Sequence, residues 1–297
     1  MSEGLVVLDT SILLRMYLYR QQTRQDLVSV LSRINDQLWV PHQVVAGFWA
    51  NREPVMMNRR RGLDEVLKTL EKKAQDSLYA VKSWAQQKGI DEASRDALTK
   101  DLSSAYAALA EAVVEHSADD GLDFFHAAKD DPVIQALGPM LSGRVGTELS
   151  AADHGVAIEE AARRTQEQIP PGYLDRHKSG HGAASDYVMW EQILREAQHR
   201  SVDVLLVTGD LKEDWWRRVH GELVGPRVEL CREFRERTGR SFAMVQPDTL
   251  LRVGREMLGI RIDESSVEQA ARLFEWLPTT LVAPPSTGGF ALPEAGQ

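Results

Sequence analysis

Three aspartates stand where carboxylates can gather at one edge of a sheet. Asp9 directly follows the apolar run 5–8, and Asp210 follows the longer run 202–207 after a Thr-Gly pair. Asp186 opens a segment with helical spacing just before that second run. Because the carboxyl ends of parallel strands meet at one sheet edge, we expect these side chains to lie together. Three carboxylates form a hard, oxygen-rich site suited to Mg²⁺ or Mn²⁺.

A divalent cation is the simplest counter-charge for such a cluster, because close carboxylates repel one another. A metal held in this way activates water and neutralises charge in phosphoryl transfer. A structural alternative stays open, since an aspartate at a strand end or helix start often caps a helix or closes a turn. That alternative applies most to Asp186, whereas Asp9 and Asp210 together favour a functional role.

The segment 210–216, DLKEDWW, places three acids and a lysine before two tryptophans. A helical turn starting at Asp210 would bring Asp214 to the same site as a further ligand. The alternative is a helix start with favourable acids, followed by tryptophans that pack in the core. Lys212 could neutralise developing charge or form an ion pair with Glu213 or Asp214, and both interpretations remain open.

Apolar runs alternate with helical patterns along the chain, which is typical of an α/β protein. Residues 5–8 and 202–207 are nearly all apolar and predict strands buried on both faces of a parallel sheet. Shorter strands are expected at 38–40 and 241–245. Charged helical patterns over 53–117 predict two antiparallel helices that meet at Gly89. Further helices are predicted near 12–34, after Pro41, and at 152–168, 186–194, 227–238, 249–258 and 265–276.

The composition is that of a soluble globular protein, with 43% hydrophobic and 27% charged residues in a chain of 297. It excludes collagen-like chains and disulfide scaffolds, since Cys231 is the one cysteine. No signal peptide or membrane-spanning run is recognisable, so a cytoplasmic location without membrane association is expected. The net charge of −9 argues against a protein that coats nucleic acid with its whole surface.

A local basic patch for nucleic acid is compatible with that charge. Residues 52–73 carry seven basic and four acidic side chains, a local net charge of +3, although a solvated helix face is the alternative. The Pro- and Gly-rich segment 169–185 immediately precedes Asp186 and is expected to be a functional loop. Zinc at His177 and His181 is disfavoured, because no cysteine or second histidine pair lies near them. The candidate phosphate contacts are Arg52, Arg176, His177, Lys178 and Lys212.

Several short motifs, taken in chain order, resemble the PIN-like domain family. The resemblance runs over about residues 5–250, and the order of the motifs gives it weight. It also fits Asp131-Pro132 and the GRVG run at 143–146. The main motifs are LDTS at 8–11, WVPHQ at 39–43, FWANR at 48–52, PPGYLD at 170–175 with Lys178, DYVMW at 186–190 and VTGDLKEDWW at 207–216.

The resemblance implies a PIN-like three-layer fold and a divalent-metal-dependent nuclease, with RNA favoured over DNA. It also implies a role in toxin–antitoxin systems, RNA processing or host defence. The expected organisation is one domain over 1–282, with a helical insertion at about 53–168 and a disordered tail at 283–297. A homodimer or a regulatory protein partner is a further expectation. The implied ligands of Mg²⁺ or Mn²⁺ are Asp9, Asp186 and Asp210, with Asp214 as an extra ligand and Ser11, Thr208 and Asn51 in support.

One position departs from the family pattern. Gly47 stands where the family has a glutamate, one residue before Phe48. A glycine inside a helix is also less favourable than alanine by ~1 kcal/mol. Three aspartates could hold the metal alone, or Glu53 could substitute, although it lies well round the helix from Gly47. The third interpretation is a weakened nuclease that binds RNA or a protein partner without cutting.

A haloacid-dehalogenase-like phosphatase is a further alternative. Gly209-Asp210 followed by Asp214 resembles that family's last acidic motif. Its nucleophile motif needs two acids separated by one residue, whereas Asp9 is followed two residues later by Ser11. Nucleotide-binding folds of the Rossmann and P-loop kinds are disfavoured, because no glycine-rich loop follows the first strand.

Overall fold

A computed structural model of the protein describes residues 4–118, 122, 128–177 and 184–272. The predicted tail at 283–297 lies outside these ranges. The chain divides into two compact units, one formed by Met1–Val55 with Phe125–Gln297 and the other by Met56–Phe124. The predicted insertion at about 53–168 contains the second unit together with segments that belong to the first.

The first unit is built on a four-stranded parallel sheet with the strand order β2-β1-β3-β6. All four residues of β1 are buried, as expected for a strand covered on both faces. The expected α/β fold with a central parallel sheet is therefore confirmed. The strands are β1 (Leu5–Leu8), β2 (Leu38–Trp39), β3 (Val204–Val207) and β6 (Phe242–Val245).

The register of the sheet aligns the ends of β1 and β3. Leu8 is the last residue of β1, and it pairs with Val207, the last residue of β3. The N–H of Asp9 donates to the carbonyl of Val207 at 3.0 Å, and the N–H of Thr208 donates to Val245 at 3.1 Å. The residues that leave these two strands are therefore neighbours at one edge of the sheet.

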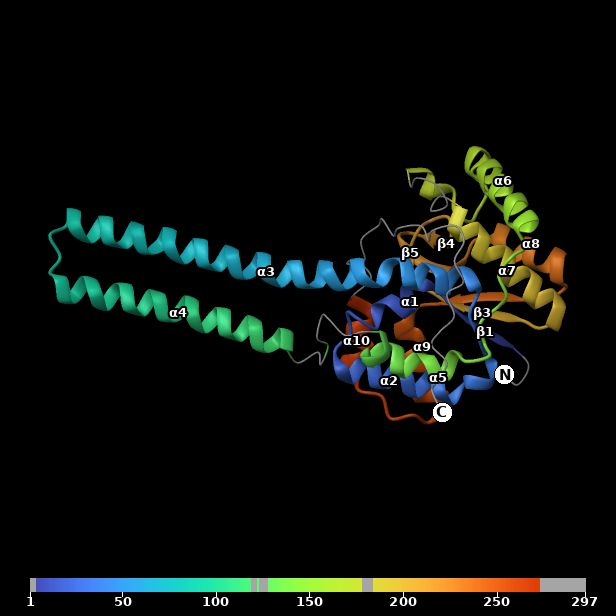
Figure 1. Ribbon diagram of the computed structural model, residues 1–297, viewed down its shortest axis with the longest axis horizontal. Coiled ribbons are helices and arrows are strands. Elements are labelled where there is room, and N and C mark those ends of the chain that lie inside the picture. The colour runs from blue at the N-terminus through green and yellow to red at the C-terminus, as the bar shows by residue number, and fades with distance from the viewer. Residues whose placement is uncertain (1–3, 119–121, 123–127, 178–183, 273–297) are drawn as a thin grey trace. The chain divides into compact units, whose positions relative to one another are not determined.

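Helices cover both faces of this sheet, so the first unit has three layers (Figure 1). The helix α1 (Thr10–Arg15) begins directly after β1. Fully buried Trp190 and Phe234 pack together in the core with a ring-centroid distance of 5.9 Å. One layer contains α2 (Gln21–Arg33), α5 (Pro132–Leu141), α9 (Pro247–Leu258) and α10 (Glu264–Arg272), and the other contains α6 (Ala151–Glu167), α7 (Ser185–Arg200) and α8 (Val228–Thr238).

The second unit consists of two antiparallel helices, as predicted. They are the later part of α3 (His42–Gln87), from Met56 onward, and α4 (Glu92–Ala118). Gly89 lies in the turn between them with φ of +67°, a conformation that glycine adopts without strain. The hydroxyl oxygens of Ser77 and Tyr106 lie 3.2 Å apart across the pair.

A small antiparallel hairpin was not predicted. It joins β4 (Trp216–Val219) to β5 (Glu222–Pro226). Three of the four residues of β4 are exposed, so the strand lacks a clear apolar alternation. The turn residues His220 and Gly221 both have positive φ, which matches a tight hairpin turn. The remaining short elements are the 3₁₀ turns η1 (Asn35–Gln37), η2 (Ala128–Asp130) and η3 (Tyr173–His177).

Within the described part of the chain, no helix is both apolar enough and long enough to cross a bilayer.

Candidate active site

Asp9 occupies the N-cap position of α1, but its carboxylate does not cap the helix. Its Oδ2 instead accepts hydrogen bonds from the hydroxyl of Ser11 at 2.6 Å and the hydroxyl of Thr208 at 2.8 Å. The same hydroxyl oxygens accept in turn from the N–H groups of Gly209 and Asp210, at 2.9 and 3.0 Å. Ser11 and Thr208 therefore tie the end of β1 to the segment that follows β3.

Lys212 lies among three carboxylates. Its Nζ is 2.9 Å from Oδ2 of Asp186, 2.9 Å from Oδ2 of Asp210 and 3.1 Å from Oδ1 of Asp175. Burial alone would lower the pKa of Lys212, but the charges of these three acids raise it above its ordinary value. The ammonium group therefore stays protonated at the centre of the cluster. These three contacts involve neither Glu213 nor Asp214, the two acids suggested by sequence spacing, although the charge of Lys212 lowers the pKa of Asp214.

Asp175 is a member of the cluster that the sequence reasoning did not assign. It lies on η3, and its side chain is 5% exposed. Its only sequence signal is its place at the end of the PPGYLD motif. Asp175 could not be predicted from the ends of strands, because η3 belongs to a loop between two helices.

Asp214 is fully buried. Its Oδ2 accepts from the N–H of Gly172 at 2.9 Å and that of Leu174 at 3.4 Å, so this carboxylate anchors the loop that carries Asp175. Burial, with a further contribution from the charge of Asp186, raises the pKa of Asp214 to about 6. The chain makes a single turn at Lys212 and then enters β4.

The electrostatics of the site show that its acids are close enough to repel one another. Burial is the main reason that the pKa values of Asp9 and Asp210 lie above the ordinary aspartate value. The charge of Asp186 raises both of them further. Asp186 is therefore the acid whose charge acts on Asp9, Asp210 and Asp214 alike.

Gly47 lies on α3 beside the residue that follows Asp9. A Cβ built on Gly47 would lie 3.0 Å from Oγ1 and 3.2 Å from Cγ2 of Thr10, the residue after Asp9. A side chain at position 47 would therefore start against the side chain of Thr10. Asn51 lies one turn later on α3 and donates from its amide to the carbonyl of Gly47 at 2.8 Å.

The predicted phosphate contacts have different placements. Arg52 is buried, with its Nε 2.9 Å from Asp131 and 2.9 Å from the hydroxyl of Tyr17. That position suits a structural ion pair within the first unit better than a contact with a ligand in solvent. Lys178 and the side chains of Arg176 and His177 lie outside the described residues.

The donor chemistry of the cluster fits a hard divalent cation, because it offers carboxylate oxygens and more negative charge than Lys212 neutralises. The arrangement of these side chains, however, is not that of a complete metal site. Among the residues that the structure describes, no three His, Cys, Asp or Glu side chains are grouped to hold a metal as they stand. The ammonium of Lys212 instead contacts three of the acids.

A family model described as a PIN-like domain matches residues 5–230. The chain belongs to the PIN-like domain family. The match contains β1, β3 and each acid of the cluster, from Asp9 to Asp214. The PIN-like domain is a nuclease-type fold, and the expected resemblance is thereby confirmed. Neither the curated proteins nor the solved structures gave a match.

Proposed function

We propose that this PIN-like protein is a divalent-metal-dependent nuclease that hydrolyses phosphodiester bonds. The observation that carries the proposal is the pairing of β1 with β3, which aligns Leu8 with Val207 and so brings Asp9 beside the segment of Asp210. The charge of Asp186 acts on both acids. Clustered carboxylates at the carboxyl edge of a parallel sheet suit a site for metal-assisted phosphoryl transfer.

The residues that would hold the cation are Asp9, Asp186 and Asp210. A bound Mg²⁺ or Mn²⁺ would supply an activated water and neutralise charge on the phosphate. Ser11 and Thr208 hold the Asp9 carboxylate in one orientation through two short hydrogen bonds.

Lys212 supplies a fixed positive charge beside these acids. It could offset negative charge that develops on a substrate phosphate. Asp175 holds the lysine from the loop side, which keeps its ammonium at the cluster instead of in solvent.

RNA is the favoured substrate class, and a role in defence or as a toxin-like enzyme is the favoured context. Both come from the family resemblance and not from the geometry of the site.

The test is cleavage of labelled RNA and DNA by the purified chain in Mg²⁺, Mn²⁺ or EDTA. We expect metal-dependent cleavage of RNA, no cleavage in EDTA, and no cleavage by Asp210→Asn at any metal concentration. Equal rates for the parent and Asp210→Asn would overturn the site. Cleavage of DNA alone would retain the nuclease and change its substrate.

Gly47 favours a second candidate function, a binding module that holds RNA or a protein partner without cutting. A side chain at this position would lie beside Thr10. The glycine therefore removes the carboxylate that the family pattern places beside the residue after Asp9. Tight RNA binding by the parent with no cleavage in any metal would favour this candidate.

A further inference from the structure

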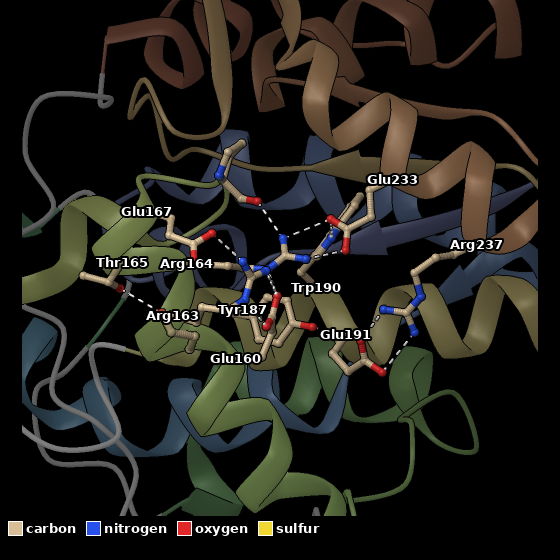
Figure 2. A network of polar contacts seen from close by, with 12 residues as sticks. Glu160, Arg163, Arg164, Thr165, Glu167, Tyr187, Trp190, Glu191, Glu233 and Arg237 are labelled. Carbon is tan, nitrogen blue, oxygen red and sulfur yellow. Dashed lines mark hydrogen bonds and ion pairs between the residues drawn. The ribbon is translucent and has the colours of Figure 1, made fainter.

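An ion pair between buried Arg164 and half-buried Glu233 joins α6 to α8 (Figure 2). Arg164 on α6 is buried, and its guanidinium forms a two-point contact with Glu233 on α8. The two hydrogen bonds measure 2.5 Å from Nη2 to Oε1 and 3.0 Å from Nη1 to Oε2. Two parallel bonds fix the orientation of the guanidinium plane as well as its position.

The remaining contacts of Arg164 saturate most of its donors. Its Nε donates to Glu160 at 2.8 Å, and its guanidinium lies over the ring of Tyr187 at 4.4 Å from the ring centroid. Its Nη1 also donates to the carbonyl of Pro170 at 2.7 Å. The same guanidinium therefore fixes the backbone at the start of the loop that carries Asp175.

The first connection to the acidic cluster runs through that loop. Gly172 lies two residues after Pro170 and donates its N–H to Asp214 at 2.9 Å. The N–H of Asp175 donates to the carbonyl of Gly172 at 3.1 Å, and the carboxylate of Asp175 then contacts Lys212. The loop is thus held by Arg164 at one end and by the cluster at the other.

The second connection runs through two tryptophans. Oε2 of Glu233 accepts from the indole N–H of Trp190 at 2.9 Å. Trp190 packs edge-to-face on Trp215, with ring centroids 6.2 Å apart. The indole N–H of Trp215 lies 3.3 Å from Oδ2 of Asp186 and donates to it. Glu233 therefore reaches Asp186 through one hydrogen bond, one ring contact and a second hydrogen bond.

The simpler explanation is that the pair only stabilises the fold. A buried ion pair is weak evidence for stability, since well-packed apolar residues often do as well. Apolar residues in place of the pair could not donate to the carbonyl of Pro170 and accept from the indole of Trp190. They therefore could not orient both groups at once. Groups that orient the residues of a site through a second set of hydrogen bonds commonly change activity by ~10- to 100-fold when altered.

We propose that Arg164 and Glu233 are positioning residues for the acidic cluster, with Arg164 orienting the loop of Asp175 and Glu233 orienting Trp215 against Asp186. The role in catalysis rests on the proposed nuclease function. The positioning itself does not rest on that function, so the positioning role and the nuclease proposal can be tested separately.

The experiment labels the chain with 5-fluorotryptophan and compares ¹⁹F spectra of the parent, Arg164→Lys, Glu233→Gln and the control Arg272→Lys. Arg272 lies on α10 and forms an exposed ion pair with Glu268 of the same helix. Trp190→Phe and Trp215→Phe assign the two resonances. We expect both test variants to shift the Trp215 resonance and the control to leave it unchanged.

Cleavage kinetics give the second readout. We expect kcat to fall by ~10- to 100-fold in Arg164→Lys and Glu233→Gln, with KM within about 3-fold of the parent. Because Glu233→Gln keeps an oxygen for Trp190 and a similar volume, it provides the test if Arg164→Lys does not fold.

The outcomes separate the two proposals. Unchanged Trp215 resonances in both test variants, or an equal shift in Arg272→Lys, overturn the positioning role. Shifted resonances with parental kcat show that the orientation of Trp215 does not affect the reaction, and they overturn the role of the pair in catalysis. Shifted resonances in a chain that cuts no substrate support the positioning, while the nuclease proposal fails separately.

Discussion

Gly172 lies directly against Asp186. A Cβ built on Gly172 would be 3.2 Å from Cβ of Asp186, a distance that leaves no room without movement. The φ of Gly172 is +91°, which side-chain-bearing residues rarely adopt. The N–H of the same glycine donates to Asp214. The loop can approach two acids of the cluster because this residue has no side chain.

Gly172→Ala is therefore expected to damage the cluster as well as the fold. Gly221→Ala is the matched control, since Gly221 has φ of +88° and open space around its Cβ position. The positive φ alone should reduce the stability of either variant by about 1–2 kcal/mol. Crowding against Asp186 should add ~1–3 kcal/mol to Gly172→Ala only. Urea unfolding checks the difference, and equal losses in the two variants would contradict it.

Asp9→Asn should separate stability from activity. Burial raises the pKa of Asp9, and the charge of Asp186 raises it further, so the ionised carboxylate is disfavoured in the fold. Asparagine keeps an oxygen that can accept from Ser11 and Thr208. We expect metal-dependent cleavage to be lost while the melting temperature in EDTA stays equal to that of the parent or rises. A lower melting temperature together with retained cleavage would contradict both expected results.

Reasoning from the sequence located the acids that follow strands. The apolar runs at 5–8 and 202–207 identify buried parallel strands, and the residues after such strands meet at one sheet edge. Asp9 and Asp210 could therefore be proposed before any geometry was known. Gly47 could be placed as well, because its helix follows a recognisable strand.

The partners within the cluster could not be predicted in the same way. Asp175 reaches Lys212 from 37 residues away, through a loop whose path depends on Arg164 and Asp214. Helical spacing from Asp210 left open whether Asp214 is a further ligand or an acid at a helix start, and it gave no sign that the carboxylate of Asp214 accepts from the N–H of Gly172. Local periodicity carries no information on such tertiary contacts.

Lys212→Met should destabilise the metal-free protein, because it leaves Asp175, Asp186 and Asp210 without their shared counter-charge. Removing one partner of a buried ion pair lowers stability by about 3–5 kcal/mol. Lys82→Met is the control, since Lys82 is exposed on α3. We expect Mn²⁺ to restore part of the loss in Lys212→Met. Thermal melts in EDTA and in Mn²⁺ measure both effects, and parental stability in EDTA would contradict the account of the cluster.

Glu191 gives a prediction for acid pH. Burial alone would raise the pKa of Glu191, but hydrogen bonds from Arg237 and Arg195 lower it below the ordinary glutamate value. A lowered pKa means that the stabilisation is present at neutral pH and is lost as pH falls through the folded-state value. Because both arginines are partly exposed, Glu191→Gln should lower stability by about 1–2 kcal/mol at pH 7.

The difference between Glu191→Gln and the parent should shrink at acid pH, once the parent's own carboxylate is protonated. Glu196→Gln is the control, because Glu196 pairs with Arg200 of the same helix and with no other arginine or lysine of the described residues. Urea unfolding between pH 3 and pH 7 follows both differences. A gap for Glu191→Gln that stays constant over that range would show that its ion pairs are not the cause.

Gly47→Glu tests whether the departure from the family pattern limits activity. The new side chain would start against Thr10, the residue after Asp9, and we expect its carboxylate to add negative charge near Asp9. Gly47→Gln is the matched control, since it adds the same bulk without the charge. Replacing a helix glycine favours the fold by up to ~1 kcal/mol, and crowding against Thr10 opposes that gain. We expect similar melting temperatures for the two variants in EDTA, with a larger Mn²⁺-induced increase and at least about tenfold faster cleavage for the glutamate only. Equal Mn²⁺ responses in the two variants would show that position 47 does not contribute to the metal site.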